Sequence, residues 1–142
     1  YYQINKLSKL FSQIFKTKIK KIKIVKGLIS TIKRIKKDKC KIFIISSATE
    51  NDIKLILKKN NEKLFDDILD NKKSKKKHLE NIKKKYSINY NEMLFIGDSR
   101  EDYYVSKLKK ISFILRRHKY NLELFKIKNY IYDFQNFEIN LK

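Results

Sequence analysis

The sequence predicts an α/β protein in which a parallel sheet is covered by helices on both faces. Two observations predict this fold class. Short runs of consecutive apolar residues alternate with longer segments whose apolar residues recur at helical spacing. Strands that are apolar throughout and alternate with helices are typical of parallel βαβ units, because the crossover helices cover both faces of the sheet.

The predicted elements follow one another in a regular order. Helical spacing of apolar residues predicts helices over residues 4–19 and, after Gly27, over residues 28–37. Three apolar runs predict buried strands: "IFII" at 42–45, "MLFI" at 93–96 and "ISFIL" at 111–115. Further helices are expected to begin in or after "SATEND", "DNKKSKKKH" and "GDSRED", and a last short strand is expected near residues 130–134.

Length and composition limit the classes of function. With 142 residues, 42% of them hydrophobic, the chain fits one domain with its own core. Its longest apolar run is far shorter than the roughly 18 residues that span a bilayer, so neither a transmembrane helix nor a membrane partner is expected. The single cysteine, Cys40, allows no internal disulfide, and His78 and His118 are too distant in sequence for a zinc-type cluster. The predicted location is the cytoplasm, and the oligomeric state is left open.

The formal net charge of +21 has two possible explanations. Such a charge can indicate a polyanion-binding surface. However, lysine is spread over every segment, and arginine, which is best suited to bidentate phosphate and base contacts, is rare. Abundant Lys, Ile and Asn with scarce Gly, Ala and Pro is also typical of an AT-rich genome. A specific nucleic-acid partner is therefore not expected.

Carboxylates follow the second of the three predicted strands. In open parallel sheets, ligands bind beyond the carboxyl ends of the strands, so these positions are candidates for a site. Ser99 and Asp102 have the spacing of a capping box, which explains both residues, and Glu101, as helix-start residues. The capping box does not explain Asp98, and a carboxylate at that position suits a hard cation such as Mg²⁺.

Ser46 and Lys75 are candidate phosphate-binding residues, and for each of them a purely structural role is the alternative. Ser46 and Ser47 end the first predicted strand, where their hydroxyl and N–H groups either satisfy a strand-to-helix turn or hold a phosphate at a helix N-terminus. Lys75 lies in a run of lysines and is either a solvated side chain or one that reaches back across the strand ends to a phosphoryl group. Taken singly, these residues leave both alternatives open.

Taken in order, the same residues resemble three motifs of the haloacid dehalogenase-like phosphatase superfamily. The second motif of that family is a hydrophobic strand ending in Ser or Thr, here "IFIIS"; the third is a lysine at the start of a helix, here Lys75; the fourth is a hydrophobic strand followed by G-D-x-x-x-D, here "MLFIGDSRED". "LFDDIL" resembles the strand entry that is typical of the family. "NKKSKKKHL" lies where phosphatases of the phosphoglycolate type carry G-S-P-x-x-K, with Lys75 at the lysine but Asp70, Asn71 and Lys72 in place of Gly, Ser and Pro. The resemblance covers residues 25–134 and implies a Rossmann-like three-layer sandwich with a parallel sheet.

One motif of the family has no counterpart. The first motif, D-x-D-x-T/V at the end of the first strand, supplies the nucleophilic aspartate, and no apolar strand ending in aspartate precedes Ser46. Residues 1–26 instead resemble the end of a helical cap, and residues 27–142 resemble the α/β core without its first strand. In the family that strand lies between those ending at Ser46 and Asp98, and its loss would leave buried backbone groups unpaired. The chain is therefore expected to be the C-terminal part of a longer protein.

The resemblance implies a Mg²⁺-dependent phosphatase that hydrolyses a small phosphate ester through an aspartyl-phosphate, with the nucleophile outside this chain. Asp98 would hold Mg²⁺, Ser46, Ser47 and Lys75 would bind the phosphoryl group, and Asp102 would orient Lys75 or a metal-bound water. The chain by itself is predicted to be inactive. The alternatives are a phosphomutase, a non-catalytic relative and, in another class, a basic nucleic-acid-binding module. The sequence does not determine the substrate.

Overall fold

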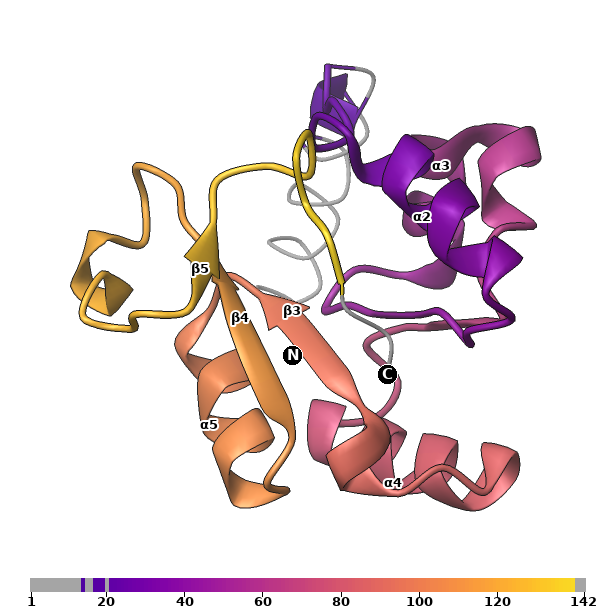
Figure 1. Ribbon diagram of the computed structural model, residues 1–142. Helices are drawn as coiled ribbons and strands as arrows, with labels where there is room; N and C mark the ends of the chain where they lie inside the picture. Colours follow the sequence, from indigo (N-terminus) through magenta and orange to yellow (C-terminus); the bar gives the residue numbers. More distant parts are fainter. Residues whose placement is uncertain (1–13, 15–16, 20, 140–142) are drawn as a thin grey trace, which may run out of the picture.

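Helices and strands alternate along the computed structural model, which describes residues 14, 17–19 and 21–139 (Figure 1). The helices are α2 (Leu28–Lys37), α3 (Glu50–Glu62), α4 (Lys75–Tyr86) and α5 (Arg100–Leu108). The strands are β1 (Phe43–Ile45), β2 (Asp67–Leu69), β3 (Leu94–Gly97), β4 (Ser112–Arg116) and β5 (Tyr130–Ile131). Two short 3-10 helices, η1 (Tyr90–Glu92) and η2 (Leu122–Leu124), precede β3 and β5. This order is the α/β alternation that the sequence predicts.

Hydroxyl side chains begin three of the helices α2 to α5. Thr49, Ser74 and Ser99 are the N-cap residues of α3, α4 and α5, and each side-chain oxygen accepts a hydrogen bond from the backbone N–H three residues later. Each such cap satisfies one of the free N–H groups at a helix start and is worth about 1 kcal/mol. Helix α2 begins instead after Gly27, whose φ of 78° lies in the left-handed region. These helix starts are therefore determined by local sequence.

The strands form two parallel sheets rather than one continuous sheet. Strand β1 pairs with β2, with Ile44 opposite Ile68. Strand β4 pairs with β3 on one side, with Ile96 opposite Ile114, and with β5 on the other. Within the described part of the chain, β1 and β3 each have a partner on one edge only. The parallel three-layer fold is therefore present, but it is divided between β1 and β3.

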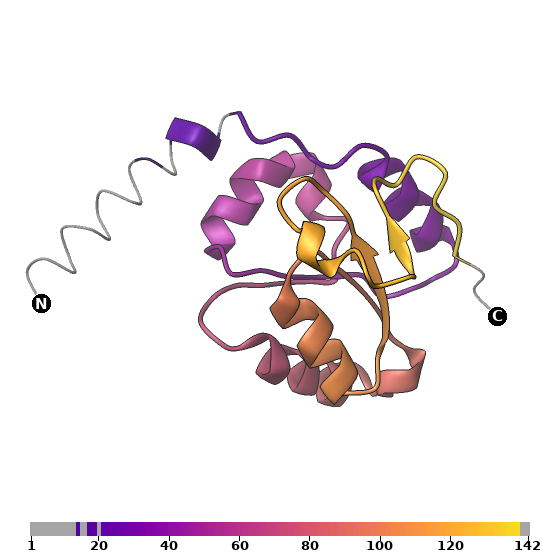
Figure 2. The same ribbon diagram turned by 90° about the vertical axis from the view of Figure 1, so that its left-hand side faces the viewer.

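Two hydrophobic clusters pack α4 and α5 against the three-stranded sheet. Figures 1 and 2 both show α5 lying along β3 and β4. One cluster joins α4 and α5 to the sheet and is built on Leu79, Val105 and Ile111. The other lies under β4 and η2 and is built on Phe113, Leu115 and Leu124. Phe95 of β3 packs against both clusters, so hydrophobic packing fixes the position of β3 and of the residues that follow it.

The C-terminal segment lies beside the start of α2 (Figure 2). The Phe134 N–H donates to the Lys26 carbonyl oxygen at 2.9 Å, and Thr31 Oγ1 donates to the Phe134 carbonyl oxygen at 3.1 Å. A Cβ added to Gly27 would lie 2.5 Å from the Phe134 carbonyl carbon. Glycine is thus required at this position both by its positive φ and by the close approach of the tail.

Most of the predicted boundaries agree with the structure to within two residues. The predicted helix 28–37 is confirmed as α2, and the three apolar runs are confirmed as β1, β3 and β4. The short strand expected near residues 130–134 is β5. The predicted helix 4–19 lies largely outside the described residues, and the division into residues 1–26 and 27–142 stays a prediction. No helix in the described ranges is long and apolar enough to cross a membrane.

Candidate active site

A cleft of about 1010 Å³ separates the two sheets. Residues 40–47, around β1, form one wall, and residues 92–99, around β3, form the other. The strand segments contribute mostly apolar side chains. The polar residues that line the cleft include all those singled out in the sequence: Ser46, Ser47, Lys75, Asp98 and Asp102. Because parallel strands present their carboxyl ends at the same edge, these residues border one end of the cleft.

Lys75, the first residue of α4, is paired with carboxylates of α5. Its Nζ donates to Asp102 Oδ1 at 2.5 Å and lies 3.4 Å from Glu101 Oε2. The side chains of Lys75 and Asp102 are only 12% and 7% exposed. Burial alone would lower the pKa of Lys75, but the hydrogen bond and charge of Asp102, together with the charge of Glu101, raise this pKa above its usual value. Lys75 therefore carries its positive charge throughout the neutral pH range.

Both carboxylate oxygens of Asp102 have partners. Besides the Lys75 contact at Oδ1, Oδ2 accepts from the Ser99 hydroxyl at 2.8 Å and from the N–H groups of Ser99 and Asp98 at 3.1 and 3.2 Å. The predicted capping box of Ser99 and Asp102 is confirmed. A Cβ on Gly97 would lie 2.5 Å from Asp102 Cβ, so glycine allows the helix to approach the strand end. This geometry suits Asp102 to hold Lys75 in place.

Asp98, in contrast, is available to a ligand. Its side chain is 53% exposed, and His118 Nε2 lies 3.4 Å from Asp98 Oδ2. The described residues contain no group of three or more His, Cys, Asp or Glu side chains arranged to hold a metal ion. Mg²⁺ takes only one or two protein carboxylates and keeps several waters, so a single exposed carboxylate fits one protein ligand of such a site. The residues present therefore fit half of a Mg²⁺ site.

Ser46 forms a hydrogen-bonded turn at the end of β1. Its N–H donates to the Leu69 carbonyl oxygen at 2.9 Å, and its Oγ accepts from the Ala48 N–H at 3.1 Å. Ser46 therefore stabilises the strand-to-helix turn, as its structural alternative predicts, and the Ala48 N–H is occupied by this hydrogen bond. The Ser46 hydroxyl keeps its own hydrogen to donate, and Ser47 is exposed where it lines the cleft. The turn can still offer hydroxyl groups to an anion at the cleft end.

Sequence reasoning missed three residues at the end of β4 and in the loop that follows it: Arg116, His118 and Asn121. Arg116 lines the cleft, and its Nε is buried with no hydrogen-bond partner in the described part of the chain. His118 faces the Asp98 carboxylate, and the Asn121 side chain donates to the Asp98 carbonyl oxygen at 2.9 Å. The position rule that singled out Ser46 and Asp98, namely what directly follows a strand, also applies to "RRHKYN" after the third apolar run.

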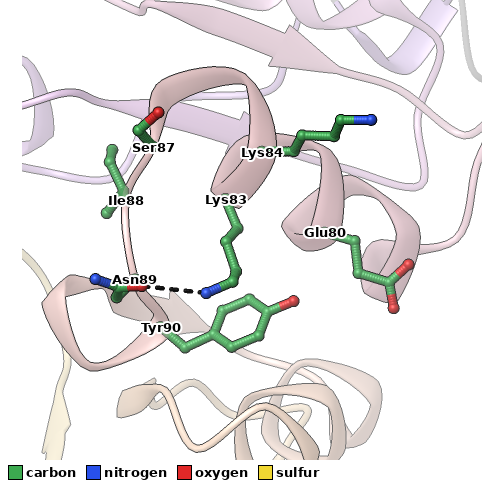
Figure 3. Close-up of a pocket in the computed structure, with 7 residues that line it drawn as sticks. All are labelled: Glu80, Lys83, Lys84, Ser87, Ile88, Asn89 and Tyr90. Atoms are coloured by element: carbon green, nitrogen blue, oxygen red, sulfur yellow. Dashed lines mark hydrogen bonds between the residues drawn. The ribbon is translucent and has the colours of Figure 1, made fainter.

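A second hollow, of about 550 Å³, lies away from these residues (Figure 3). Its lining comes from the C-terminal half of α4 and from the chain that follows: Glu80, Lys83, Lys84, Ser87, Ile88, Asn89 and Tyr90. Lys75 begins the same helix of 12 residues, which spans about 18 Å. Lys83 donates to Asn89 Oδ1 at 3.1 Å, and Glu80 is paired with Lys109 at 2.7 Å. None of the predicted site residues lines this hollow.

The fold and the site together define a parallel α/β protein. At its cleft, an exposed carboxylate that follows a strand lies with a helix-start lysine that is positively charged throughout the neutral pH range. The family model for haloacid dehalogenase-like hydrolases matches residues 2–115. The chain therefore belongs to the haloacid dehalogenase-like hydrolases, as its motifs imply. None of the curated protein sequences compared with the chain matches it.

Two solved structures have a similar fold. The Unknown transcript 4 protein (UTR4) of Saccharomyces cerevisiae matches with a TM-score of 0.64 and 21% identity, over 82% of this chain and 59% of that protein. A protein from Lactobacillus delbrueckii subsp. bulgaricus, assigned as a phosphoglycolate phosphatase, matches with a TM-score of 0.61 and 15% identity, over 75% of this chain and 48% of that protein. The chain thus spans about half of the length of either structure.

Proposed function

We propose that the intact protein is a Mg²⁺-dependent phosphatase that hydrolyses a small phosphate ester through an aspartyl-phosphate. One observation carries the proposal: Ser46, Lys75 and Asp98, which follow β1, begin α4 and follow β3, line the same cleft. The family supports hydrolysis. A serine hydroxyl and a lysine suit a phosphoryl group, whereas the exposed carboxylate suits a cation. A cytoplasmic location and a small-molecule partner belong to the same proposal.

The nucleophilic aspartate is proposed to come from outside residues 1–142, on a strand that fills the cleft between β1 and β3. Each of these strands lacks a partner on one edge within the described residues, and side chains of both line the cleft. Buried backbone N–H and C=O groups are costly when they are left unpaired. A strand parallel to β1 and β3 would pair both edges. A carboxylate at its end would lie between Ser46 and Asp98.

Each of the candidate site residues has a proposed role in this chemistry. Asp98 would hold Mg²⁺, and the bound cation would reduce the repulsion between an anionic nucleophile and an anionic phosphate. The hydroxyl of Ser46, with Ser47 beside it, would donate to phosphoryl oxygens. Lys75 would neutralise the charge that develops on these oxygens, and Asp102 would keep the lysine oriented and protonated through the contact of 2.5 Å.

Single substitutions in the full-length protein test the proposal. With p-nitrophenyl phosphate as substrate, Lys75→Ala and Asp98→Ala are each expected to lower kcat by about 10²- to 10³-fold, the usual cost of removing one electrostatic stabiliser. Lys76→Ala is the matched control, because Lys76 is the next residue of α4 but is exposed and outside the cleft. Unchanged hydrolysis by either site variant would contradict the proposal. The isolated 142-residue chain is expected to show no turnover.

The alternative functions give different results in the same preparation. A phosphomutase would transfer the phosphoryl group to an added acceptor sugar, and product analysis with and without the acceptor would detect this. A non-catalytic relative would hydrolyse nothing, even as the full-length protein. A nucleic-acid-binding module would bind DNA or RNA with an affinity that falls steeply with salt, and neither Asp98→Ala nor Lys75→Ala would abolish that binding.

A further inference from the structure

The loop that follows β4 is attached to Asp98 through the side chain of Asn121. Asn121 is only 3% exposed. Its Nδ2 donates to the carbonyl oxygens of Asp98 and Arg116, at 2.9 and 3.0 Å, and its Oδ1 accepts from the His118 N–H at 2.9 Å. Asp98 follows β3 and Arg116 ends β4, so one buried amide ties the ends of two neighbouring strands together. The main chain at Asp98 is therefore fixed by a hydrogen bond from the Asn121 side chain.

His118 contacts the other part of Asp98, its carboxylate. The Nδ1 atom of His118 accepts from the Tyr120 N–H at 3.1 Å, so in the neutral imidazole the hydrogen lies on Nε2. That Nε2 lies 3.4 Å from Asp98 Oδ2. No hydrogen bond or ion pair to Oδ1 of Asp98 is present among the described residues. One carboxylate oxygen thus faces a ring donor, and the other is left for a ligand.

We propose that His118 and Asn121 are positioning residues that hold Asp98 for cation binding, an inference that rests on the proposed function. Asn121 holds the main chain of Asp98, and His118 holds one carboxylate oxygen, Oδ2, through its ring Nε2. Carboxylates that bind metal ions are usually hydrogen-bonded in turn, and loss of such partners costs about 10- to 100-fold in metal affinity. Neither residue contacts the reacting atoms in this proposal; both act through Asp98.

Asn129 is a control for Asn121 that has the same kind of hydrogen bond, although Asn129 is exposed and Asn121 is buried. Asn129 Nδ2 donates to the Phe113 carbonyl oxygen at 3.1 Å, so it too ties a loop to β4 through a side-chain amide. Phe113 lies near the start of β4, away from the carboxyl ends of the strands. Asn129→Ala therefore removes a hydrogen bond of the same kind without touching Asp98. His118→Gln is a second control, because a glutamine amide can replace the ring donor, whereas His118→Ala cannot.

The test uses the ¹⁵N-labelled full-length protein and its variants Asn121→Ala, Asn129→Ala, His118→Ala and His118→Gln. Amide hydrogen exchange of Asp98 and Ser99, both of which donate to Asp102, reports how firmly the loop is held. Asn121→Ala is expected to speed this exchange about tenfold or more relative to Asn129→Ala. Titration with Mn²⁺, which broadens the signals of nearby amides, reports cation binding. Asn121→Ala and His118→Ala are expected to need about 10- to 100-fold more Mn²⁺, and His118→Gln close to the wild-type amount.

Three results would overturn the inference or its basis, and they can be told apart. Equal exchange of Asp98 and Ser99 in the two asparagine variants would show that Asn121 does not hold the loop. A normal Mn²⁺ requirement in both Asn121→Ala and His118→Ala would show that holding the loop does not matter for the cation. Absence of Mn²⁺ broadening at Asp98 in the wild-type chain would instead contradict the metal part of the proposed function. His118 is 23% exposed, so its variants test the inference even if Asn121→Ala fails to fold.

Discussion

Replacement of Asp102 by alanine should destabilise the protein far more than loss of an ordinary helix cap. The change removes the partner of Lys75, whose side chain is 12% exposed, and the acceptor of three hydrogen bonds that Asp98 and Ser99 donate to Oδ2. Loss of one member of a buried ion pair typically costs about 3–5 kcal/mol, because the remaining charge is buried with too little compensation. Lys75 would keep only the longer contact of 3.4 Å with Glu101, whose side chain is 53% exposed. These contributions are not additive, so we expect a total loss of about 3–5 kcal/mol in the free energy of unfolding.

Asp52→Ala is the matched control. Asp52 has the same position in α3 that Asp102 has in α5: its N–H donates to the N-cap Thr49, and its Oδ2 accepts from the Thr49 hydroxyl at 2.7 Å. It differs in having no buried lysine to neutralise, so its loss should cost only about 0.5–1 kcal/mol. Urea denaturation followed by circular dichroism measures both values. If the two variants lose equal stability, the buried pair contributes nothing beyond a cap, and the argument for Asp102 is wrong.

Two further predictions concern acid stability and the start of α2. Burial would raise the pKa of Asp66, but hydrogen bonds from Lys36, the Ile42 N–H and Lys41 lower it to about 2. A depressed carboxyl pKa contributes stability above its unfolded value of 3.8. The roughly 2 kcal/mol of Asp66 should be lost as the pH falls from about 4 to about 2. Other carboxylates, such as Asp70 and Glu80, also have lowered pKa values, so Asp66→Asn should lose less stability than the wild type over this range in urea denaturation, by about the share of Asp66. Gly27→Ala should lower the free energy of unfolding by at least about 2 kcal/mol, since alanine is strained at a φ of 78° and its Cβ would overlap Phe134. The control is Ser30→Ala, an exposed change in the first turn of α2, which should lower the free energy of unfolding by less than about 0.5 kcal/mol in the same assay. An alanine at residue 27 that is tolerated as well as one at residue 30 would show that the tail does not need glycine there.

Local features of the fold could be predicted because short segments determine them. Four consecutive apolar residues bounded by polar ones predict β1 and β3 wherever their partners lie, and the hydroxyl residues at Thr49 and Ser99 begin helices through hydrogen bonds within their own turn. The 3-10 helices η1 and η2 are too short to leave a periodic pattern. The pairing of strands into two sheets could not be predicted from periodicity, because it depends on contacts between residues far apart in sequence.

The candidate site shows the same division between local and tertiary information. Positions after strands single out Ser46 and Asp98, and the resemblance singles out Lys75 within a run of lysines, but only the fold shows that Lys75 is largely buried whereas Lys76 is exposed. Its contact with Asp102 joins residues 27 positions apart, and the buried position of both gives their ion pair its strength. The roles of His118 and Asn121 likewise depend on the approach of the loop after β4 to the end of β3.

The sequence by itself determined the order of the elements, the family to which the chain belongs and the motif residues, because each depends on residue types at fixed spacing. Only the tertiary structure decided which carboxylate is free and which is engaged. The capping-box spacing in "GDSRED" accounts for Asp102 and not for Asp98, but it does not show that Asp102 is enclosed by Lys75 and Ser99 while Asp98 is exposed at the mouth of the cleft. The physical reason is that burial and hydrogen-bond partners, rather than residue type, decide whether a carboxylate can bind a ligand.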